Sequence, residues 1–405
     1  MAKPSGWLGI VLLITIFLLQ TKNGVHYGSA ALCLAGALYF ARNFRRQISE
    51  PYFRDIVLIF FAIWIPMLLS SAFAIEKQHA FETTISYLHF FPLAIVAAAF
   101  AFEHEQRWFM TLLATLIAFW VADALIQLVF AVDVFGYVYE GGPLLGAFYP
   151  RQRLGLVVAA LSPFYLWLMW QMFGHWAPRG LSVFPVLIVL LFSLKRSGWL
   201  MFAIVLTIFL AAIAEHRKDR RSALKEVAMI VGVIAITAGV LATDDRLGQR
   251  MGSVSDIVSG APNIDEASGY RLSLWRTAGA MFADNPILGV GPRGFRHVYE
   301  RYASDSDFWS ERGQTHPHLF IAEVAAESGG LGLLGYLIAS GLILRIFLTT
   351  RASATTAARS AILAALVCWL PVNSHMAFYG SYWATLCWIT VALGVGGCRS
   401  TGTSS

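Results

Sequence analysis

The sequence predicts an all-α protein that crosses a membrane many times, with about twelve transmembrane helices. Hydrophobic residues make up 57% of the 405-residue chain and charged residues only 13%, whereas an ordinary soluble domain is about 25% charged. The mean hydropathy is +0.63. A chain this apolar needs the bilayer as its solvent, because it has too few charged side chains to cover a water-soluble core.

The apolar residues fall into separate segments, each close to the ~20 residues that cross a bilayer as a helix. The predicted spans are about 6–20, 25–41, 55–75, 83–102, 108–131, 152–173, 181–194, 197–214, 226–242, 318–348, 360–376 and 379–397. The seventh and eighth spans form one apolar stretch, which we expect a tight turn at Lys195-Arg196-Ser197-Gly198 to divide. The first span lacks a clear cleavage motif, so we expect it to be retained rather than removed as a signal peptide.

The basic residues of the short loops predict the orientation, because cytoplasmic loops carry an excess of Lys and Arg. An even number of spans places the block from Arg217 to Lys225 in the cytoplasm, together with both termini. The chain then divides into helices 1–9 at residues 1–242, a helix-containing extracytoplasmic loop at 243–317, and helices 10–12 with a short cytoplasmic tail at 318–405.

Charge and cysteine content exclude other classes of protein. The net charge of +6 comes from residues between apolar runs, so it indicates membrane topology and not a nucleic-acid surface. None of the four cysteines forms a CxxC pair, which argues against a zinc site or a disulfide framework. They are Cys33, Cys368, Cys387 and Cys398.

The large extracytoplasmic loop is rich in arginine, although basic residues are usually more frequent in cytoplasmic loops. A long loop crosses the membrane largely regardless of its charge, and a guanidinium group matches phosphate and carboxylate geometry. The pattern favours an anionic, lipid-linked ligand, although contacts with anionic lipid or with the loop's own acids stay open. The arginines are Arg246, Arg250, Arg271, Arg276, Arg293, Arg296, Arg301 and Arg312.

The middle of this loop predicts an amphipathic helix from Tyr270 to Phe282, ended by Asp284-Asn285-Pro286. Its expected apolar face holds Leu272, Trp275, Gly279 and Phe282. A glycine-rich run follows from Ile287 to Phe295. Its glycines could let backbone amides approach a phosphate, although such a run is more often only a turn.

His316-Pro317-His318 is predicted to open the tenth membrane helix. At about 100° per residue, a stripe of small residues falls on the same side of that helix as His318, and Glu323 and Glu327 fall on the opposite side. The stripe is Ala322, Ala325, Gly329 and Gly332. Small residues permit close helix packing in lipid, which would hold the histidine rigidly. An ionisable residue at a membrane boundary is a candidate for function, and a purely structural histidine is the alternative.

These motifs together resemble the O-antigen ligase/polymerase superfamily. The resemblance rests on Arg271-x3-Trp275, on the stretch from Asn285 to Pro292, and on His318 with Gly329 and Gly332 at the family's spacing. The family's turn motif is similar to Lys195-Arg196-Ser197-Gly198-Trp199, with lysine in place of the usual serine. Leu319 stands where the family tends to have Asn, Ser or Gln. That departure leaves His316 and His318 as alternatives, of which His318 has the matching glycine spacing.

The resemblance implies a glycosyltransferase with a GT-C-like fold at the periplasmic face of a bacterial inner membrane. It would transfer an O-antigen glycan from undecaprenyl diphosphate to a sugar hydroxyl of lipid A-core, completing lipopolysaccharide, with inversion and without a metal or cofactor. The single large loop favours a ligase over a polymerase of the same superfamily. The residues that the resemblance gives a structural role are Trp275, Gly289, Gly291, Gly329 and Gly332.

The chemistry assigns three catalytic candidates. Neutral His318 could accept the proton of the acceptor hydroxyl, and Arg196 and Arg271 could clamp the diphosphate as its charge grows. The substrate-binding candidates are Arg151, Arg153, Lys195, Arg293, Arg296 and His316.

Several arginine and tyrosine residues near the sixth span have two possible interpretations. Arg151 and Arg153 are equally compatible with snorkelling to the interface. The tyrosines at 137, 139 and 149 are either an interfacial aromatic belt or platforms for sugar rings. We expect His375 to be structural and His297 to be solvated.

Three other classes of function remain as alternatives. A polysaccharide polymerase of the same superfamily would extend the lipid-linked glycan. A secondary transporter would show similar halves and broken helices at the midplane, and the sequence shows no such repeat. A scaffold protein would give no reason for the extracytoplasmic arginines.

Overall fold

The computed structural model describes residues 6–103, 107–216, 220–241, 264–304, 307–309, 313–349 and 356–400, with Asp245, Gly248, Gly252 and Ser259. The described residues form helices, turns and one isolated antiparallel bridge between Val132 and Val138. The predicted all-α class is therefore confirmed. The chain forms two compact units. Unit 1 comprises Met1–Leu12, Val25–His104 and Ser253–Ser405, and unit 2 comprises Leu13–Gly24 and Glu105–Gly252.

Seven helical segments of the described chain are long and apolar enough to cross a membrane. They are α2 (Gly24–Gln47), α3 (Pro51–Phe73), α4 with α5 (Lys77–Tyr87 and Phe90–Glu103), α6 (Arg107–Phe130), α7 (Leu154–Met172), α16 (Phe320–Thr349) and α18 (Ser381–Ser400). The other five predicted spans are also helical. They correspond to α1 with η1 (Trp7–Phe17 and Leu18–Gln20), α8 with α9 (Trp176–Leu181 and Val183–Phe192), α10 (Arg196–His216), α11 (Arg220–Leu241) and α17 (Thr356–Cys368). The chain is thus a multi-pass membrane protein.

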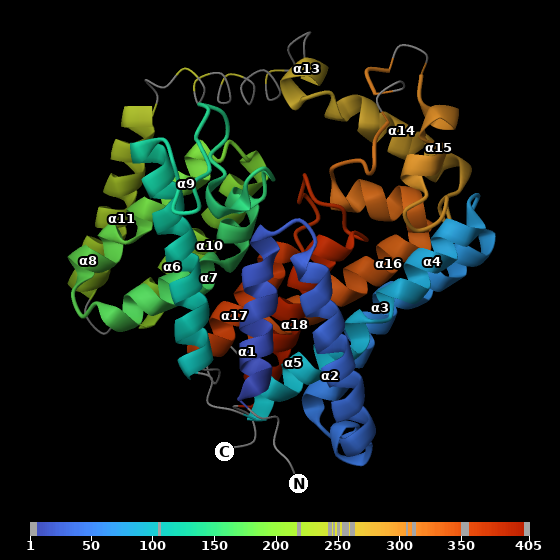
Figure 1. The fold of residues 1–405 in the computed structure, drawn as a ribbon, viewed down its shortest axis with the longest axis horizontal. Helices are drawn as coiled ribbons and strands as arrows, with labels where there is room; N and C mark the ends of the chain where they lie inside the picture. The colour runs from blue at the N-terminus through green and yellow to red at the C-terminus, as the bar shows by residue number, and fades with distance from the viewer. Residues whose placement is uncertain are drawn as a thin grey trace. The chain divides into compact units, whose positions relative to one another are not determined.

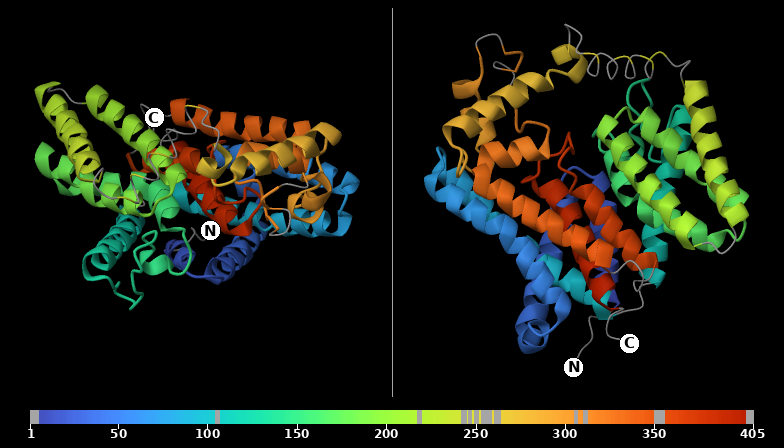
Figure 2. Two further views of the ribbon diagram at one scale, coloured as in Figure 1. Left: turned by 90° about the horizontal axis from the view of Figure 1, so that it is seen from above. Right: turned by 180° about the vertical axis from the view of Figure 1, so that it is seen from behind.

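Close helix pairs form the core of unit 1. Helix α18 packs against α5 and α17, and α16 lies along α3 (Figure 1); the same pairs are seen from behind in Figure 2. Glycines make this proximity possible. A β-carbon at Gly396 would lie 2.2 Å from the Ala98 carbonyl oxygen, and one at Gly335 would lie 1.9 Å from that of Ala62. Small residues allow backbones in lipid to come this close.

The segment before α16 contributes three described helices, α13 (Ile264–Ser268), α14 (Arg271–Asp284) and α15 (Phe295–Tyr302). Helices α14 and α15 pack over the beginning of α16 around a small apolar cluster. The cluster contains Leu274, Ala278, Met281, Val290, Phe295, Val298, Tyr299 and Ala326. This packing fixes the loop to α16, within one compact unit.

The expected apolar face of α14 is wrong. Leu274, Ala278 and Met281 are buried, whereas Gly279 is exposed and Leu272 is only partly buried. Both sets of residues recur at helical spacing, and the set of Leu274, Ala278 and Met281 is the one buried in the cluster shared with α15 and α16. Periodicity alone could not distinguish them, because apolar residues lie on two adjacent faces of this helix.

Helix α16 also differs from the expectation. It begins at Phe320, two residues after His318, and its backbone leaves the helical conformation at Gly329 (φ 64°, ψ −159°). The angular stripe from His318 to Gly332 is therefore not continuous. Glu323 and Glu327 are fully buried, each with 0% exposure. Both acids are therefore packed inside the protein, so α16 is not buried only along its stripe of small residues.

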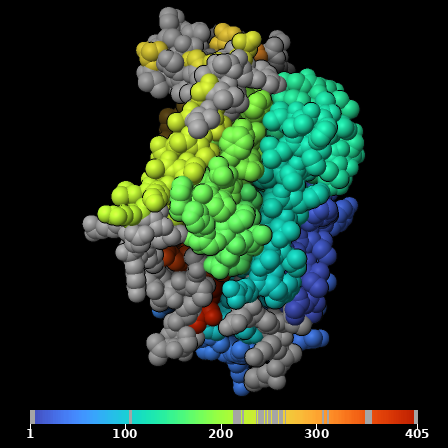
Figure 3. Space-filling model, turned by 90° about the vertical axis from the view of Figure 1, so that its left-hand side faces the viewer, coloured from blue at the N-terminus to red at the C-terminus, as the bar shows by residue number. Residues whose placement is uncertain are grey.

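Unit 2 is built around α7, which is buried along almost its whole length among α6, α9 and α10. Helix α11 packs against α8 and α9, and Figure 3 shows α11 (yellow-green) beside the green helices that precede it. A turn divides the seventh and eighth spans as predicted, but it lies at Ser193–Lys195, where Leu194 has a φ of 55°, because α10 already begins at Arg196.

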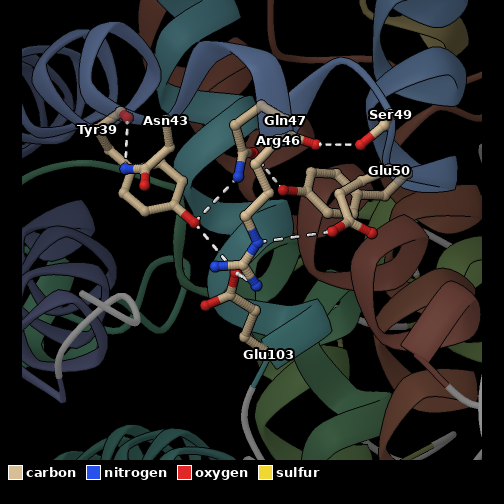
Figure 4. Close-up of polar contacts among 8 residues, drawn as sticks. Tyr39, Asn43, Arg46, Gln47, Ser49, Glu50 and Glu103 are labelled. Atoms are coloured by element: carbon tan, nitrogen blue, oxygen red, sulfur yellow. Dashed lines mark hydrogen bonds and ion pairs between the residues drawn. The ribbon is translucent and has the colours of Figure 1, made fainter. Parts of the chain in front are cut away.

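A polar network joins the end of α2 to the end of α5 in unit 1 (Figure 4). Arg46 Nη2 lies 2.8 Å from Glu103 Oε1, and the Tyr39 hydroxyl donates to the same oxygen across 3.2 Å. Gln47 donates to the Tyr39 hydroxyl across 3.1 Å. Because Arg46 and Glu103 compensate one another, this network has a structural role and is separate from the candidate site below.

Candidate functional site

Three histidines of unit 1 gather at the beginning of α16. The ring centroids of His316 and His318 are 4.1 Å apart, and those of His318 and His375 are 6.1 Å apart. His375 lies in the segment between α17 and α18, because α17 ends at Cys368 instead of continuing to about residue 376. Pro371 follows shortly after that end, where it cannot continue the helix. His375 was expected to be structural, and its position makes it a neighbour of the candidate base.

The backbone of α16 holds this neighbouring segment in place. The amide of Phe320 donates to the Asn373 carbonyl and that of Ile321 donates to the Pro371 carbonyl, both across 3.2 Å. The first amides of a helix have no partner within the helix. The 371–375 segment therefore binds to the N-terminus of α16 and brings His375 next to His318.

Arg271 reaches the same place from the segment before α16. It is the first residue of α14, and its Nη1 donates to the Ser374 hydroxyl across 3.2 Å. One turn later, the Trp275 indole donates to the Pro317 carbonyl across 3.1 Å. The spacing Arg271-x3-Trp275 thus attaches a single helix face to the two segments that carry the histidines.

A carboxylate cap sets the start of α14. Asp265 Oδ1 accepts from the Leu272 amide across 3.0 Å, and the Ser268 hydroxyl accepts from the Arg271 amide, also across 3.0 Å. Such side-chain oxygens satisfy the unpaired first amides of a helix. The cap therefore fixes the point at which the Arg271 side chain leaves the helix.

Arg293 is a further cation near this site. Its guanidinium acts electrostatically on His316, Glu323 and Glu327. Its Nη1 is buried and has no hydrogen-bond partner among the described residues. A guanidinium nitrogen without a partner in a polar site can donate to an anionic ligand.

The environment of His316 keeps this ring neutral. The side chain is 7% exposed, and its Nδ1 lies 2.9 Å from the Thr315 hydroxyl oxygen. Burial, with electrostatic effects of His318 and Arg293, lowers the pKa of His316 from 6.5 to about 2, although a hydrogen bond with the His375 backbone acts in the opposite direction. His316 therefore remains uncharged at neutral pH.

The glycine-rich run does not form a phosphate cradle. Glu327 accepts from the amides of Arg293 and Phe295, across 2.6 and 3.3 Å. The amides of Val290 and Gly291 donate to the backbone carbonyls of α16, at 2.9 and 3.0 Å. The carboxylate of Glu327 thus occupies the place in which an external anion was considered.

The close packing of the glycine-rich run against α16 requires the glycines of the motif. A β-carbon at Gly289 would lie 2.5 Å from the Glu327 carbonyl carbon, and one at Gly329 would lie 2.4 Å from the Ile287 carbonyl. Gly291 has a φ of 110° and approaches Ala74, and Gly332 packs on Ser328. The run from Asn285 to Gly294 and the kink of α16 therefore fit together as backbone against backbone.

Glu323 completes the support of the histidine site. It accepts from the amides of Phe378 and Tyr379, across 2.9 and 3.2 Å. The segment before α18 is thus bound to the first turn of α16. Sequence reasoning missed the roles of Glu323 and Glu327, although two acids one turn apart in an apolar helix were a usable signal.

The remaining cations group separately, in unit 2. Arg153 directly precedes α7, and Lys195 and Arg196 stand at the start of α10. A β-carbon at Gly198 would lie 3.0 Å from the Gly155 carbonyl oxygen, so the two helix N-termini are in contact. The Lys195 ammonium donates to the Gln152 amide oxygen, between Arg151 and Arg153.

This grouping favours an anion. Helix N-termini carry partial positive charge and attract phosphate groups, and here two N-termini coincide with Arg151, Arg153, Lys195 and Arg196. Arg196 therefore lies with the predicted substrate-binding residues of unit 2, and Arg271, Arg293 and His318 lie together in unit 1.

The other predicted residues are placed as follows. Arg296 is exposed in the first turn of α15, and His297 is also exposed and stacks on His79 at 4.4 Å. Arg246, Arg250 and Arg312 lie outside the described residues. Among the residues that the structure describes, no three His, Cys, Asp or Glu side chains are placed to hold a metal ion.

Comparison with known proteins gives a family for the central part of the chain. Residues 181–337 match a family model described as O-antigen ligase. No curated protein matches the chain. The matched segment includes the turn at Arg196, the helix that carries Arg271, and α16 as far as Leu337. The part of the chain from α9 into α16 is therefore similar to the O-antigen ligase family.

Proposed function

We propose that the protein is an O-antigen ligase: a glycosyltransferase that moves a glycan from undecaprenyl diphosphate to a sugar hydroxyl of lipid A-core. The observation that carries this proposal is the convergence of Arg271 with His316, His318 and His375 at the start of α16. Arg271, His316 and His318 lie within the segment that matches the O-antigen ligase family, and His375 lies C-terminal to it.

The proposed reaction is a single displacement. The acceptor oxygen attacks the anomeric carbon as the bond from that carbon to the diphosphate oxygen breaks, which inverts the configuration. The leaving diphosphate keeps the electron pair, and its growing charge is stabilised by Arg271. The acceptor proton passes to the imidazole of His318, which acts as the general base. The lipid diphosphate supplies the leaving group, so the step needs no nucleotide, metal or redox cofactor.

Arg293 and His316 have supporting roles in this proposal. Buried His316 cannot carry a charge at neutral pH, so its ring packs beside His318 without adding electrostatic repulsion. The unsatisfied Arg293 Nη1 is available to a phosphate oxygen. This arrangement favours His318 over His316 as the base, because a base must be able to hold the proton that it receives.

The proposed topology follows the predicted one: twelve spans in the inner membrane, both termini in the cytoplasm, and a periplasmic loop at 243–317. Cysteine labelling tests it. Asp265 caps α14, so the label belongs at its exposed neighbour Glu266. Glu266→Cys should react with a membrane-impermeant maleimide in intact spheroplasts. Labelling that requires disrupted membranes would contradict this topology.

Reconstitution tests the activity. Purified protein in nanodiscs is incubated with an undecaprenyl diphosphate glycan and rough lipopolysaccharide, with a chelator present. A ligase attaches the glycan to lipid A-core, whereas a polymerase lengthens the lipid-linked glycan. We expect the first product, and its loss in Arg196→Ala and Arg271→Ala. Formation of only longer lipid-linked chains would refute the ligase assignment.

A further inference from the structure

A pocket of about 380 Å³ lies in unit 2, at a distance along the chain from the catalytic candidates. Its lining includes Thr21 and Lys22 from the turn after η1, Phe135 and Tyr137 from the segment after α6, and Tyr149 and Arg151 from the segment before α7. Its volume falls within the range of small-ligand sites, about 300–1,000 Å³. One sugar residue with a substituent would fit a space of this size.

Aromatic rings form one wall of the pocket. The rings of Tyr137 and Tyr149 are stacked, with centroids 4.9 Å apart and planes at 25°. Phe135 lies beside them, 6.5 Å from Tyr137. The three side chains remain 37–47% exposed. Rings that are stacked but still open on one side present a flat apolar face with a polar edge, which suits the C–H face of a pyranose.

Buried polar groups of α6 hold these rings in position. Asp123 is fully buried and accepts from the amides of Val134 and Ala147, across 3.0 and 2.7 Å. Gln127 donates to the Tyr137 carbonyl across 3.1 Å and accepts from the Gly146 amide across 2.8 Å. Both segments that carry the rings are thus bound to one rigid helix, so the pocket is preformed.

Two cations stand at this wall. Lys22 and Arg151 line the pocket, and no carboxylate is among the lining residues that the structure describes. The Arg151 backbone is fixed, because its amide donates to the Phe148 carbonyl across 2.7 Å. A guanidinium and an ammonium beside a stacking face would bind a sugar that carries a phosphate or carboxylate group.

From this geometry, we infer that the pocket of Lys22, Tyr137, Tyr149 and Arg151 binds a phosphorylated pyranose residue of the acceptor glycan. The assignment as acceptor rests on the proposed function; the binding itself does not. The rings then act as a sugar platform and not as an aromatic belt in the lipid interface. A belt residue contacts headgroups and needs neither a stacked partner nor buried carboxylates behind it.

The test measures binding without glycosyl transfer. The full chain is placed in phosphatidylcholine nanodiscs, which offer no anionic headgroup. The probe is phosphorylated core oligosaccharide, freed from lipid A by mild acid, and affinity is measured by calorimetry and by saturation-transfer NMR. Dephosphorylated oligosaccharide and inorganic phosphate are the comparison ligands.

Two substitutions separate the two parts of the site. We expect Tyr149→Leu to weaken the binding of both oligosaccharides by roughly tenfold. Arg151→Gln should reduce the affinity for the phosphorylated form to that of the dephosphorylated form. The matched controls are Phe130→Leu, whose ring is 71% exposed outside the pocket, and Arg107→Gln at the opposite end of α6; neither should change the affinity.

The possible outcomes distinguish a failure of the proposed sugar-binding pocket from a failure of the proposed transferase activity. Unchanged affinity in Tyr149→Leu and Arg151→Gln would overturn the inference, as would equal affinity for inorganic phosphate alone. Binding that follows the expected pattern in a chain that transfers no glycan would support the pocket and refute the transferase. Active transfer with no oligosaccharide binding at this pocket would refute only the pocket.

Discussion

The indole of Trp275 donates a hydrogen bond to the carbonyl of Pro317 across 3.1 Å, and Pro317 separates His316 from His318. One helix, α14, thereby positions both histidines. Together with the bond from Arg271 to Ser374, this contact makes α14 the element that assembles the site in unit 1.

Trp275→Phe removes this hydrogen bond while keeping an aromatic ring. We expect the rate of glycan transfer to fall on the order of tenfold, because a small displacement of a catalytic group is costly. Single-turnover kinetics in nanodiscs would measure it. The control is Trp64→Phe, which loses a comparable bond to the Thr84 carbonyl elsewhere in unit 1. Equal rates in the two variants would show that the Trp275 bond does not position the site.

Glu327→Gln should destabilise the protein by about 1–3 kcal/mol, because it leaves one amide of the Arg293–Phe295 turn facing an NH₂ group instead of a carboxylate oxygen. Thermal unfolding in detergent would measure the change. Glu82→Gln is the matched control, since the Glu82 side chain is 60% exposed; its effect should stay below about 0.5 kcal/mol. Similar unfolding temperatures for the two variants would contradict the structural role of Glu327.

Gly329→Ala should cost at least about 2 kcal/mol, because the position has a positive φ and a β-carbon there would clash with the Ile287 carbonyl. Gly289→Ala should behave similarly. Gly279→Ala is the control: it lies within α14 with nothing within 4 Å of its added β-carbon, so a neutral or stabilising effect is expected. Unfolding temperatures, and the yield of folded protein, distinguish these cases. A tolerated Gly329→Ala would exclude the close docking of Ile287.

His316 should make the protein less stable in acid. Its pKa is lowered to about 2 in the folded state, against about 6.5 when unfolded. Between these values the unfolded chain binds more protons, so the free energy of unfolding falls as the pH drops below about 6.5. His316→Asn should therefore flatten the dependence of unfolding temperature on pH between 4.5 and 7.5. The exposed His26→Gln should preserve it. An unchanged slope in His316→Asn would contradict the burial of a neutral His316.

The membrane helices were readable from the sequence because hydropathy and length determine them almost alone. The turn before Arg196 and the helix that begins at Arg271 were also predicted, the first from a polar break and the second from helical spacing. The buried face of α14 was not predicted. Leu272 and Leu274 are both apolar, and only the packing against α15 decides which of them is buried.

The site was predicted in its residues more than in its geometry. Arg271, His316 and His318 come together as separate motifs suggested, but the role of His375 depends on where α17 ends. The stripe along α16 failed because a straight helix was assumed through Gly329. The structural role of Glu327 was missed because its partners are backbone amides, and a pattern of side chains does not show which amides a carboxylate will bind.

The most direct test of the account is the rate of glycan transfer by His318→Ala in the reconstituted reaction, with membrane protein levels matched to the native chain. A general base of this kind contributes about 10²–10⁴-fold, so we expect the rate to fall by that factor. Transfer to lipid A-core at the native rate would show that His318 is not the base and would contradict the central claim.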